Sequence, residues 1–149
     1  MFVERKGNGF LLTHRLRVRY SETDQMGVVY NGNYLTWFEI SRTELCRNFG
    51  TTYREWEDRG FMLPVVEAHC RYKRPARYDD LVSLYCRAPA EHIKPQSVLF
   101  EYQLWVDDNR LIAEGWTKHA FVDREGKLFR KENRFQSWLL QETKKQAEG

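Results

Sequence analysis

A single aspartate stands shortly before an Asn-Gly-Asn step in the stretch TDQMGVVYNGNYLTWFE. Asn31 and Asn33 are residue types that often precede a helix, and Gly32 lets the backbone turn tightly between them. A helix that begins here has unpaired N–H groups and a partly positive end, which together can stabilise an oxyanion. Asp24 lies close before it in the chain, and Gly27 permits a tight turn in between. The residues therefore predict a carboxylate beside an oxyanion site, where a carbonyl can be attacked or water activated.

The elements on either side must hold this stretch in place. Alternation of apolar and polar residues from Leu12 to Tyr20 predicts a half-buried strand before it. After it, apolar residues recur at helical spacing and predict a helix of about 31–49 that is enclosed over a wide arc. They are Tyr34, Trp37, Phe38, Ile40, Leu45 and Phe49. Gly50 is expected to end this helix as a left-handed cap, and residues 53–59 to form one further short turn.

The rest of the chain is typical of an antiparallel sheet. Turn-rich joints separate four predicted strands, at 61–72, 81–88, 98–106 and 111–122. A short helix with Phe135, Trp138 and Leu139 then runs into a charged tail. One strand, one long helix and four more strands predict an α+β fold in which a sheet of five or more strands wraps around a central helix. The whole chain, 1–149, is predicted to be one domain, of which about 133–149 is the C-terminal helix and tail.

Composition narrows the class of protein. A chain of 149 residues fits one domain, and a net charge of +3 is too small for a dedicated nucleic-acid binder but suits an anionic small molecule. The three cysteines are far apart and lack CxxC spacing, which argues against disulfides and against a zinc site and favours a reducing cytoplasm. No signal peptide and no apolar run of membrane-spanning length is present, so we expect a soluble cytoplasmic protein.

The segment TDQMGVVYNGNYLTWFEISRTE closely resembles the signature of the 4-hydroxybenzoyl-CoA thioesterase family, in particular its acyl-CoA thioesterase branch associated with the Tol-Pal system. RYKRPARYDDLV and GWTKHAFVDREGK resemble further segments of that family, so the resemblance covers most of the chain. It implies a hotdog fold, no cofactor and no metal, and a homodimer or homotetramer with active sites between subunits. The thioester carrier would be CoA or an acyl-carrier protein.

The resemblance also implies roles for individual residues. Asp24 corresponds to the catalytic carboxylate, either as a nucleophile or as a general base on water. The backbone amide of Asn31 corresponds to the group that polarises the thioester carbonyl, although many relatives carry His or Tyr at this position. Substrate binding is expected from Gly27, Tyr30, Tyr34, Lys94 and Ser97, the last two at the nucleotide end of CoA.

Other chemistry is less well supported by the sequence. Glu39 lies about 12 Å along the predicted helix from its first residues, and we expect it to pair with Arg42 or with a partner subunit. The four histidines are scattered and form neither an HxxxH nor a GxSxG pattern. Two alternatives to a thioesterase remain open: a hydratase on the same fold, which would need a His-Asp or His-Glu pair, and a non-catalytic module that binds acyl-CoA or acyl-carrier protein.

Overall fold

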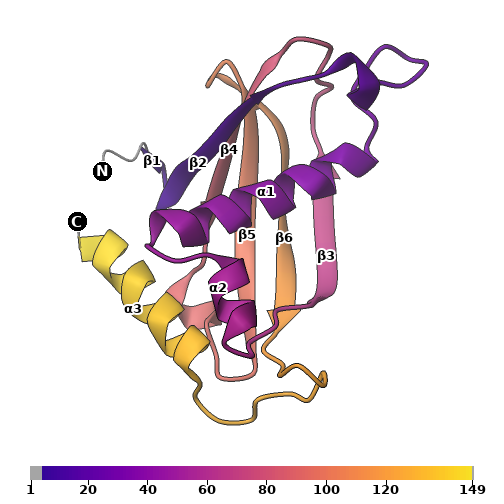
Figure 1. Cartoon of the computed structure of the whole chain (residues 1–149). Coiled ribbons are helices and arrows are strands. Elements are labelled where there is room, and N and C mark those ends of the chain that lie inside the picture. Colours follow the sequence, from indigo (N-terminus) through magenta and orange to yellow (C-terminus); the bar gives the residue numbers. More distant parts are fainter. Residues whose placement is uncertain (1–4, 149) are drawn as a thin grey trace.

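A single six-stranded antiparallel sheet is the largest element of the computed structural model, which describes residues 5–148 (Figure 1). In spatial order its strands are β1 (Arg5–Lys6), β2 (Phe10–Arg17), β4 (Leu81–Arg87), β5 (Ser97–Val106), β6 (Arg110–Ala120) and β3 (Val65–Tyr72). The predicted sheet of five or more strands is therefore confirmed, and β1 is an additional short strand. Because β3 lies at one edge, its outer backbone groups pair with no other strand among residues 5–148.

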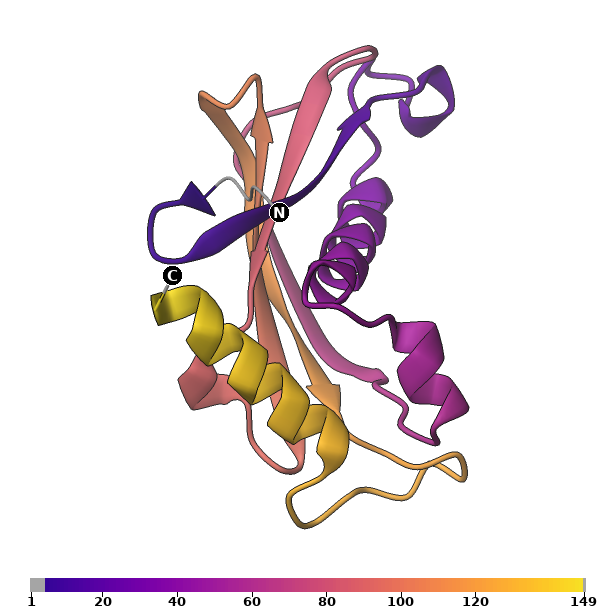
Figure 2. The ribbon, with the colours of Figure 1, turned by 60° about the vertical axis from the view of Figure 1, so that its left-hand side comes forward.

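Helix α1 (Gly32–Asn48) lies across one face of this sheet, and the sheet curves toward it (Figures 1 and 2). On β5 the alternation predicted from the sequence is observed, since Val98, Phe100, Tyr102, Leu104 and Val106 are all buried beneath the helices. The ring of Phe38 stacks on that of Tyr102 at 4.3 Å between centroids. Gly115 on β6 makes this close approach possible, because a Cβ there would lie 2.9 Å from the Phe38 ring and 2.0 Å from the His69 carbonyl oxygen.

The boundaries of α1 agree with the predicted helix of about 31–49, and Gly50 follows it with a φ of +113°, as expected for the cap. Enclosure of the helix is less complete than predicted. Leu35 is 42 % exposed, and Thr36 and Glu39 are exposed as well, because the sheet covers only one side of α1.

Helices α2 (Tyr53–Asp58) and α3 (Arg134–Glu148) close the end of the molecule opposite the start of α1 (Figure 1). The Trp56 ring stacks on Phe135 at 4.7 Å between centroids, and Trp138 lies 5.5 Å from Trp56. Helix α3 extends over 15 residues, so the prediction of a short helix followed by a tail is wrong. The aromatic contacts of its first two turns explain this, since they anchor one face of the helix.

The first long strand differs from its prediction. Pairing of β2 with β4 is irregular between Leu12 and His14, where the register shifts. A β-bulge of this kind moves the following side chains to the other face. Leu12 pairs with Tyr85, whereas His14 and Leu16 pair with the core residues Leu84 and Val82, so Leu12 is the residue that does not share the predicted apolar side. His14 lies on that side but is exposed. No helix within residues 5–148 is both long and apolar enough to span a membrane.

Candidate active site

Asp24 lies at the base of a tight loop between β2 and α1. The loop closes where Thr23 pairs with Val29, and the Asp24 amide donates to the Val28 carbonyl over 2.9 Å. The Gly27 amide donates back to the Asp24 carbonyl, and Gly27 has a φ of +77°, a conformation that favours glycine. One carboxylate oxygen of Asp24, Oδ1, accepts the Met26 amide at 2.9 Å. The second oxygen has no hydrogen-bond partner among residues 5–148, so it is available for chemistry.

Glu22 connects this loop to the helix through hydrogen bonds. This role was not predicted from the sequence. Its buried carboxylate accepts the indole N–H of Trp37 at 3.2 Å and the Arg19 amide at 2.7 Å. Its backbone carbonyl accepts the Tyr30 amide and the side-chain amide of Asn33, both at 2.8 Å. Glu22 therefore fixes both sides of the Asp24 loop relative to the first turns of α1. A helical Trp that needs a buried acceptor was the one signal for it in the sequence.

The start of α1 differs in detail from the expected cap. Asn31 occupies the cap position but has helical dihedral angles, and its side chain accepts no hydrogen bond from the helix. Asn33 is not a cap, because its side chain donates to Glu22 instead. The helix therefore begins at the predicted place, with Asn31 at the cap position, but without a side-chain cap. As a result the backbone N–H groups of Asn31 and Gly32 have no protein acceptor in the described part of the chain.

Aromatic rings surround these free amides. Tyr30 is 56 % exposed, and its ring lies against Gly32, where an added Cβ would come within 2.9 Å. Tyr34 is buried between Trp37 and Tyr72, with both ring centroids 5.2 Å away. The Tyr72 hydroxyl donates to the Asn31 carbonyl at 3.3 Å. Tyr30 is thus exposed beside the free amides, whereas Tyr34 packs within the core.

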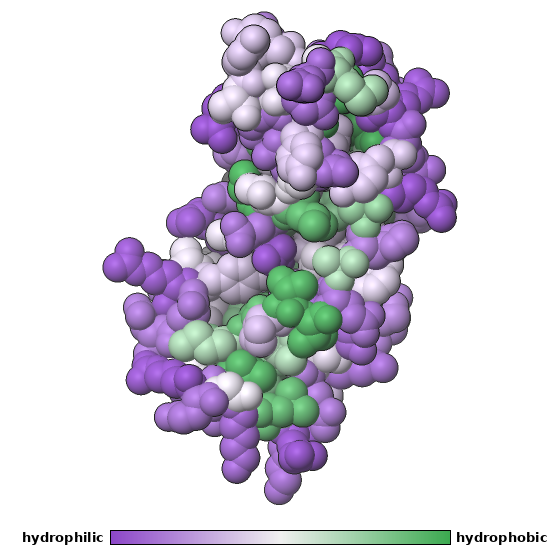
Figure 3. All heavy atoms as spheres, turned by 90° about the vertical axis from the view of Figure 1, so that its right-hand side faces the viewer, coloured by the Kyte–Doolittle hydropathy of each residue, from purple (hydrophilic) through white to green (hydrophobic). Residues whose placement is uncertain are grey.

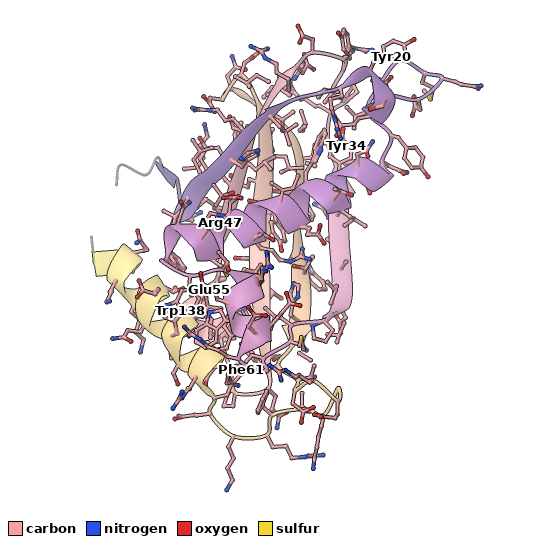
Figure 4. All side chains as sticks on the ribbon, viewed as in Figure 1. Tyr20, Tyr34, Arg47, Glu55, Phe61 and Trp138 are labelled. Atoms are coloured by element: carbon pink, nitrogen blue, oxygen red, sulfur yellow. The ribbon has the colours of Figure 1, made fainter. Side chains whose placement is uncertain are left out.

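Electrostatics link Asp24 to the start of α1. Burial raises the pKa of the Tyr34 hydroxyl, and the negative charges of Asp24 and Asp80 raise it further. The field of the Asp24 carboxylate therefore reaches the first turn of the helix. Figure 4 shows Tyr34 on this first turn, with Tyr20 at the near end of the loop. Asp24, Gly27, Tyr30 and Asn31 are brought together in one region.

Lys94 and Ser97 are not part of that region within one chain. The Lys94 amide donates to the Ser97 carbonyl at 2.8 Å in the turn before β5. Ser97 pairs with Ala120, at the end of the sheet where β3 begins. Asp24 lies at the other end, where the neighbouring Val29 amide donates to the Ala76 carbonyl before β4.

A buried polar relay runs under the middle of α1, and the sequence did not reveal it. His119 is fully buried, and its Nδ1 lies 3.0 Å from the Leu63 carbonyl, which can only accept, so Nδ1 carries the proton. Its Nε2 then accepts the Thr117 hydroxyl at 2.8 Å, and Thr117 in turn accepts the Tyr102 hydroxyl. Arg42 donates to Tyr102 at the far end of this relay.

The charges of this relay follow from its burial. Burial lowers the pKa of His119 to about 4, so the ring is neutral at pH 7. Glu39 lies 3.9 Å from Arg42, which confirms the expected pairing, and Glu44 pairs with Arg47 at 3.3 Å. Neither glutamate lies at the start of α1.

Comparison with known proteins identifies the family. The model of the thioesterase-like superfamily matches residues 18–143. This chain belongs to the thioesterase-like superfamily. The predictions of a hotdog fold and of a thioester hydrolase are thereby confirmed.

Individual members of the superfamily agree with this assignment. The putative acyl-CoA thioesterase YneP of Bacillus subtilis is 34 % identical over 110 residues, which cover 74 % of this chain and 78 % of that protein. The acyl-CoA thioesterase YbgC of Haemophilus influenzae is 32 % identical over 78 % of this chain and 82 % of its own length. The crystal structure of a DHNA-CoA thioesterase from Staphylococcus aureus superimposes with a TM-score of 0.80 at 29 % identity, covering 90 % of this chain and 89 % of that one.

Proposed function

We propose that this protein hydrolyses acyl-CoA thioesters, with the Asp24 carboxylate and the free amides of Asn31 and Gly32 as the reacting groups. The observation that carries the proposal is the pair of N–H groups at the start of α1 that have no acceptor among residues 5–148, beside a loop whose aspartate has one oxygen without a partner in the same range. The relatives named as acyl-CoA thioesterases support CoA as the carrier. The more specific likeness to 4-hydroxybenzoyl-CoA thioesterases and to the Tol-Pal branch stays a prediction, as does an acyl-carrier protein as the alternative carrier.

Two routes to the products use these groups. In one, the Asp24 carboxylate attacks the thioester carbon, CoA leaves as its thiolate and takes up a proton, and water hydrolyses the mixed anhydride. In the other, Asp24 takes a proton from a water molecule as that water attacks the same carbon. Both routes place negative charge on the carbonyl oxygen, where an aligned N–H donor is worth about 3 kcal/mol.

A homodimer through β3 is part of the proposal. β3 is an edge strand, and apolar side chains gather on this face of the molecule (Figure 3), with Val65 47 % and Val66 53 % exposed. Such edges in proteins are normally covered or paired. Two copies of one edge strand related by a two-fold axis through its centre pair antiparallel. The Tyr72 end of one β3, with its neighbouring α1 start, then lies beside the Val65 end of the other.

The dimer accounts for residues that one chain leaves apart. Lys94 and Ser97 lie at the Val65 end of the sheet, and therefore at the same end as the partner's Asp24. This supports their expected role at the nucleotide end of CoA, with Gly27 and Tyr30 nearer the reacting carbonyl. A tetramer would need a second contact surface. Binding of nucleic acid is not expected, and the cytoplasm remains the expected location.

Substitution of Asp24→Asn tests the catalytic assignment. Release of CoA from a panel of short, long and aromatic acyl-CoAs, measured with a thiol reagent, should fall by at least about a hundredfold while fold and dimer persist. Retention of activity in the variant would remove Asp24 from the mechanism. A wild-type protein that releases no CoA but binds acyl-carrier protein would instead be a binding module.

Substitution of Val66→Lys tests the dimer. A charge on the exposed edge should favour the monomer in sedimentation or light scattering and lower CoA release along with it. A fully active monomer would contradict an active site between subunits. Glu67→Gln is the matched control, since it changes another exposed side chain of β3 without adding a charge, and it should leave both the dimer and CoA release unchanged.

A further inference from the structure

Arg42 is a buried cation with little compensation. It lies in the middle of α1 and is 9 % exposed, whereas most arginines remain in water. Within the described chain only one carboxylate, that of Glu39, comes within 4 Å of its guanidinium, at 3.9 Å. The Glu39 side chain is itself 66 % exposed, so this ion pair is long and largely solvated. A buried charge without a close counter-ion is costly.

The other neighbours of Arg42 are neutral. Burial raises the pKa of the Tyr53 and Tyr102 hydroxyls and raises that of the Cys46 thiol to about 12, so all three keep their protons at pH 7. His119 is neutral as well, because burial lowers its pKa, and the charge of Arg42 contributes in the same direction. The positive charge of Arg42 is therefore not cancelled by the relay beneath it.

A cavity opens directly above this cation. It has a volume of about 900 Å³ and lies between α1, α2, the segment before β3 and the loop after β6. Apolar walls come from Phe61, Leu63 and Phe135, and Arg42 lies among the lining residues. Figure 4 shows Arg47 and Phe61 on the elements that border this space. Three further arginines and three acidic residues also line the cavity, but Arg42 is the buried one among the arginines. The part of the cavity formed by Arg42 and these apolar walls suits an apolar chain that ends in a negative charge.

We propose that this cavity binds the far end of an acyl group that terminates in a carboxylate, held by the Arg42 guanidinium. The planar guanidinium can donate two parallel hydrogen bonds to a carboxylate. A phosphate is a poorer fit, because Arg42 is the only buried cation among the described lining residues and the exposed Glu57 and the half-buried Asp123 also border the cavity. The rim arginines are partly engaged, since Arg47 pairs with Glu44 and Arg124 donates to the Asp58 carbonyl.

The inference rests on the proposed function for the thioester end of the ligand. In the β3-paired dimer the partner's Asp24 lies at the Val65 end of β3, beside this cavity. The thioester would then react at the start of one α1 while its acyl chain reaches the Arg42 of the other copy. A short dicarboxylic acyl group, bound to CoA through one of its carboxyl carbons, fits this arrangement.

Two acyl-CoAs of equal chain length test the inference on the wild-type protein. Glutaryl-CoA ends in a carboxylate and valeryl-CoA in a methyl group, and we expect kcat/KM to be at least about tenfold higher for glutaryl-CoA. Arg42→Gln should remove this preference, and Arg42→Lys should keep part of it because the charge remains. Arg87→Gln is the matched control, since Arg87 is half-buried, pairs with Glu101 at 2.7 Å and lies away from the cavity. Equal kcat/KM values in the wild type would overturn the inference.

Binding measurements separate this inference from the proposed function. Calorimetric titration of the Asp24→Asn variant with the same two thioesters should show at least about tenfold tighter binding of glutaryl-CoA. If neither thioester is hydrolysed by the wild type but this difference in affinity is found, the proposed function fails and the carboxylate site stands. If both are hydrolysed and bound alike, the site fails and the proposed function stands. Glu39→Gln should strengthen the preference, because it removes the carboxylate that lies within 4 Å of Arg42, whereas a purely structural Arg42 would leave the preference unchanged.

Discussion

Two loops of this protein have the same design and different surroundings. Asp24 and Asp123 each begin a four-residue turn that ends in glycine, Gly27 with a φ of +77° and Gly126 with a φ of +82°. In both loops the aspartate amide donates to the carbonyl four residues later, the glycine amide donates back, and Oδ1 accepts a backbone amide two residues on. Both turns also close on an isolated strand-like pair. An aspartate in such a turn therefore says nothing by itself about catalysis.

The segment that each loop enters makes the difference. The first leads into α1, whose opening amides have no protein acceptor in the described chain, whereas the second leads into the segment before α3. Asp123 is also more heavily used, because its Oδ1 accepts the amides of both Glu125 and Lys127. Of the two loops, and within the described residues, the first alone combines a less engaged carboxylate with N–H donors that lack an acceptor.

The largest expected effect comes from replacing each of the two aspartates by asparagine in a separate variant. Asp24→Asn should lower CoA release by at least about a hundredfold, while both variants preserve an oxygen for the turn. Asp123→Asn should lower it at most severalfold, since Asp123 borders the Arg42 cavity but not the free amides. Steady-state rates on one acyl-CoA measure both variants. Similar losses in the two variants would mean that the turn, rather than its position beside α1, is what matters.

Low pH should destabilise the protein at His119, which lies close to the second loop. His119 binds the Leu63 carbonyl, next to the pairing of Met62 with Val122 that precedes this loop. Unfolded His119 takes up a proton below its ordinary pKa of 6.5, but folded His119 resists until about 4, so stability is full above 6.5 and falls as pH drops toward 4. We expect a loss of about 2 kcal/mol in the free energy of unfolding between pH 7.5 and 5, measured by urea titration.

The control for this effect is His119→Gln, which should show a shallower decline over the same range. An equally steep decline in that variant would assign the acid sensitivity to other groups. At pH 5 the measured activity should fall in proportion to the fraction of protein that is folded.

Substitution of Glu22, which contacts only the first loop, should have a smaller effect on activity than substitution of Asp24. Glu22→Gln keeps one oxygen but loses the charge that accepts the Trp37 indole and the Arg19 amide. We expect kcat to fall by about tenfold with KM little changed, because the Asp24 loop would be held less firmly against α1. A change in KM alone, or in thermal stability alone, would contradict this positioning role.

The smallest expected effect concerns the two glycines. A Cβ added at Gly27 or Gly126 meets no atom within 4 Å, so the cost of an alanine is backbone strain alone. Gly27→Ala and Gly126→Ala should each lower the free energy of unfolding by about 1 kcal/mol in denaturant titrations. Only Gly27→Ala should also reduce CoA release. A reduction by both would show that the two loops are not distinguished by their surroundings.

Much of the fold could be predicted from local patterns. The α1 helix and the β5 alternation follow from side-chain periods that the structure satisfies with buried residues such as Phe38 and Phe100. The bulge between Leu12 and His14 could not be predicted, because an extra residue in one strand depends on its pairing with β4. The length of α3 depends equally on distant contacts, those of Phe135 and Trp138 with Trp56.

The candidate site was predictable in part for a similar reason. Asp24, Gly27 and Asn31 lie close in the sequence, so their neighbourhood was visible, and the resemblance to a family supplied the roles. Glu22 and Arg42 could not be found in this way. Each acts through residues distant in the chain or buried by the fold, such as Tyr102 beneath Arg42, and no local pattern records that burial.

The aromatic cluster at the lower end of the molecule also supplies an optical signal. Trp56 stacks on Phe135, a wall residue of the Arg42 cavity, and the Arg59 guanidinium lies 4.9 Å above the Trp56 ring. Indole fluorescence responds to the polarity and charge of its surroundings. A ligand that enters the cavity should therefore alter the emission of unlabelled protein, which would let occupancy be followed in real time during turnover.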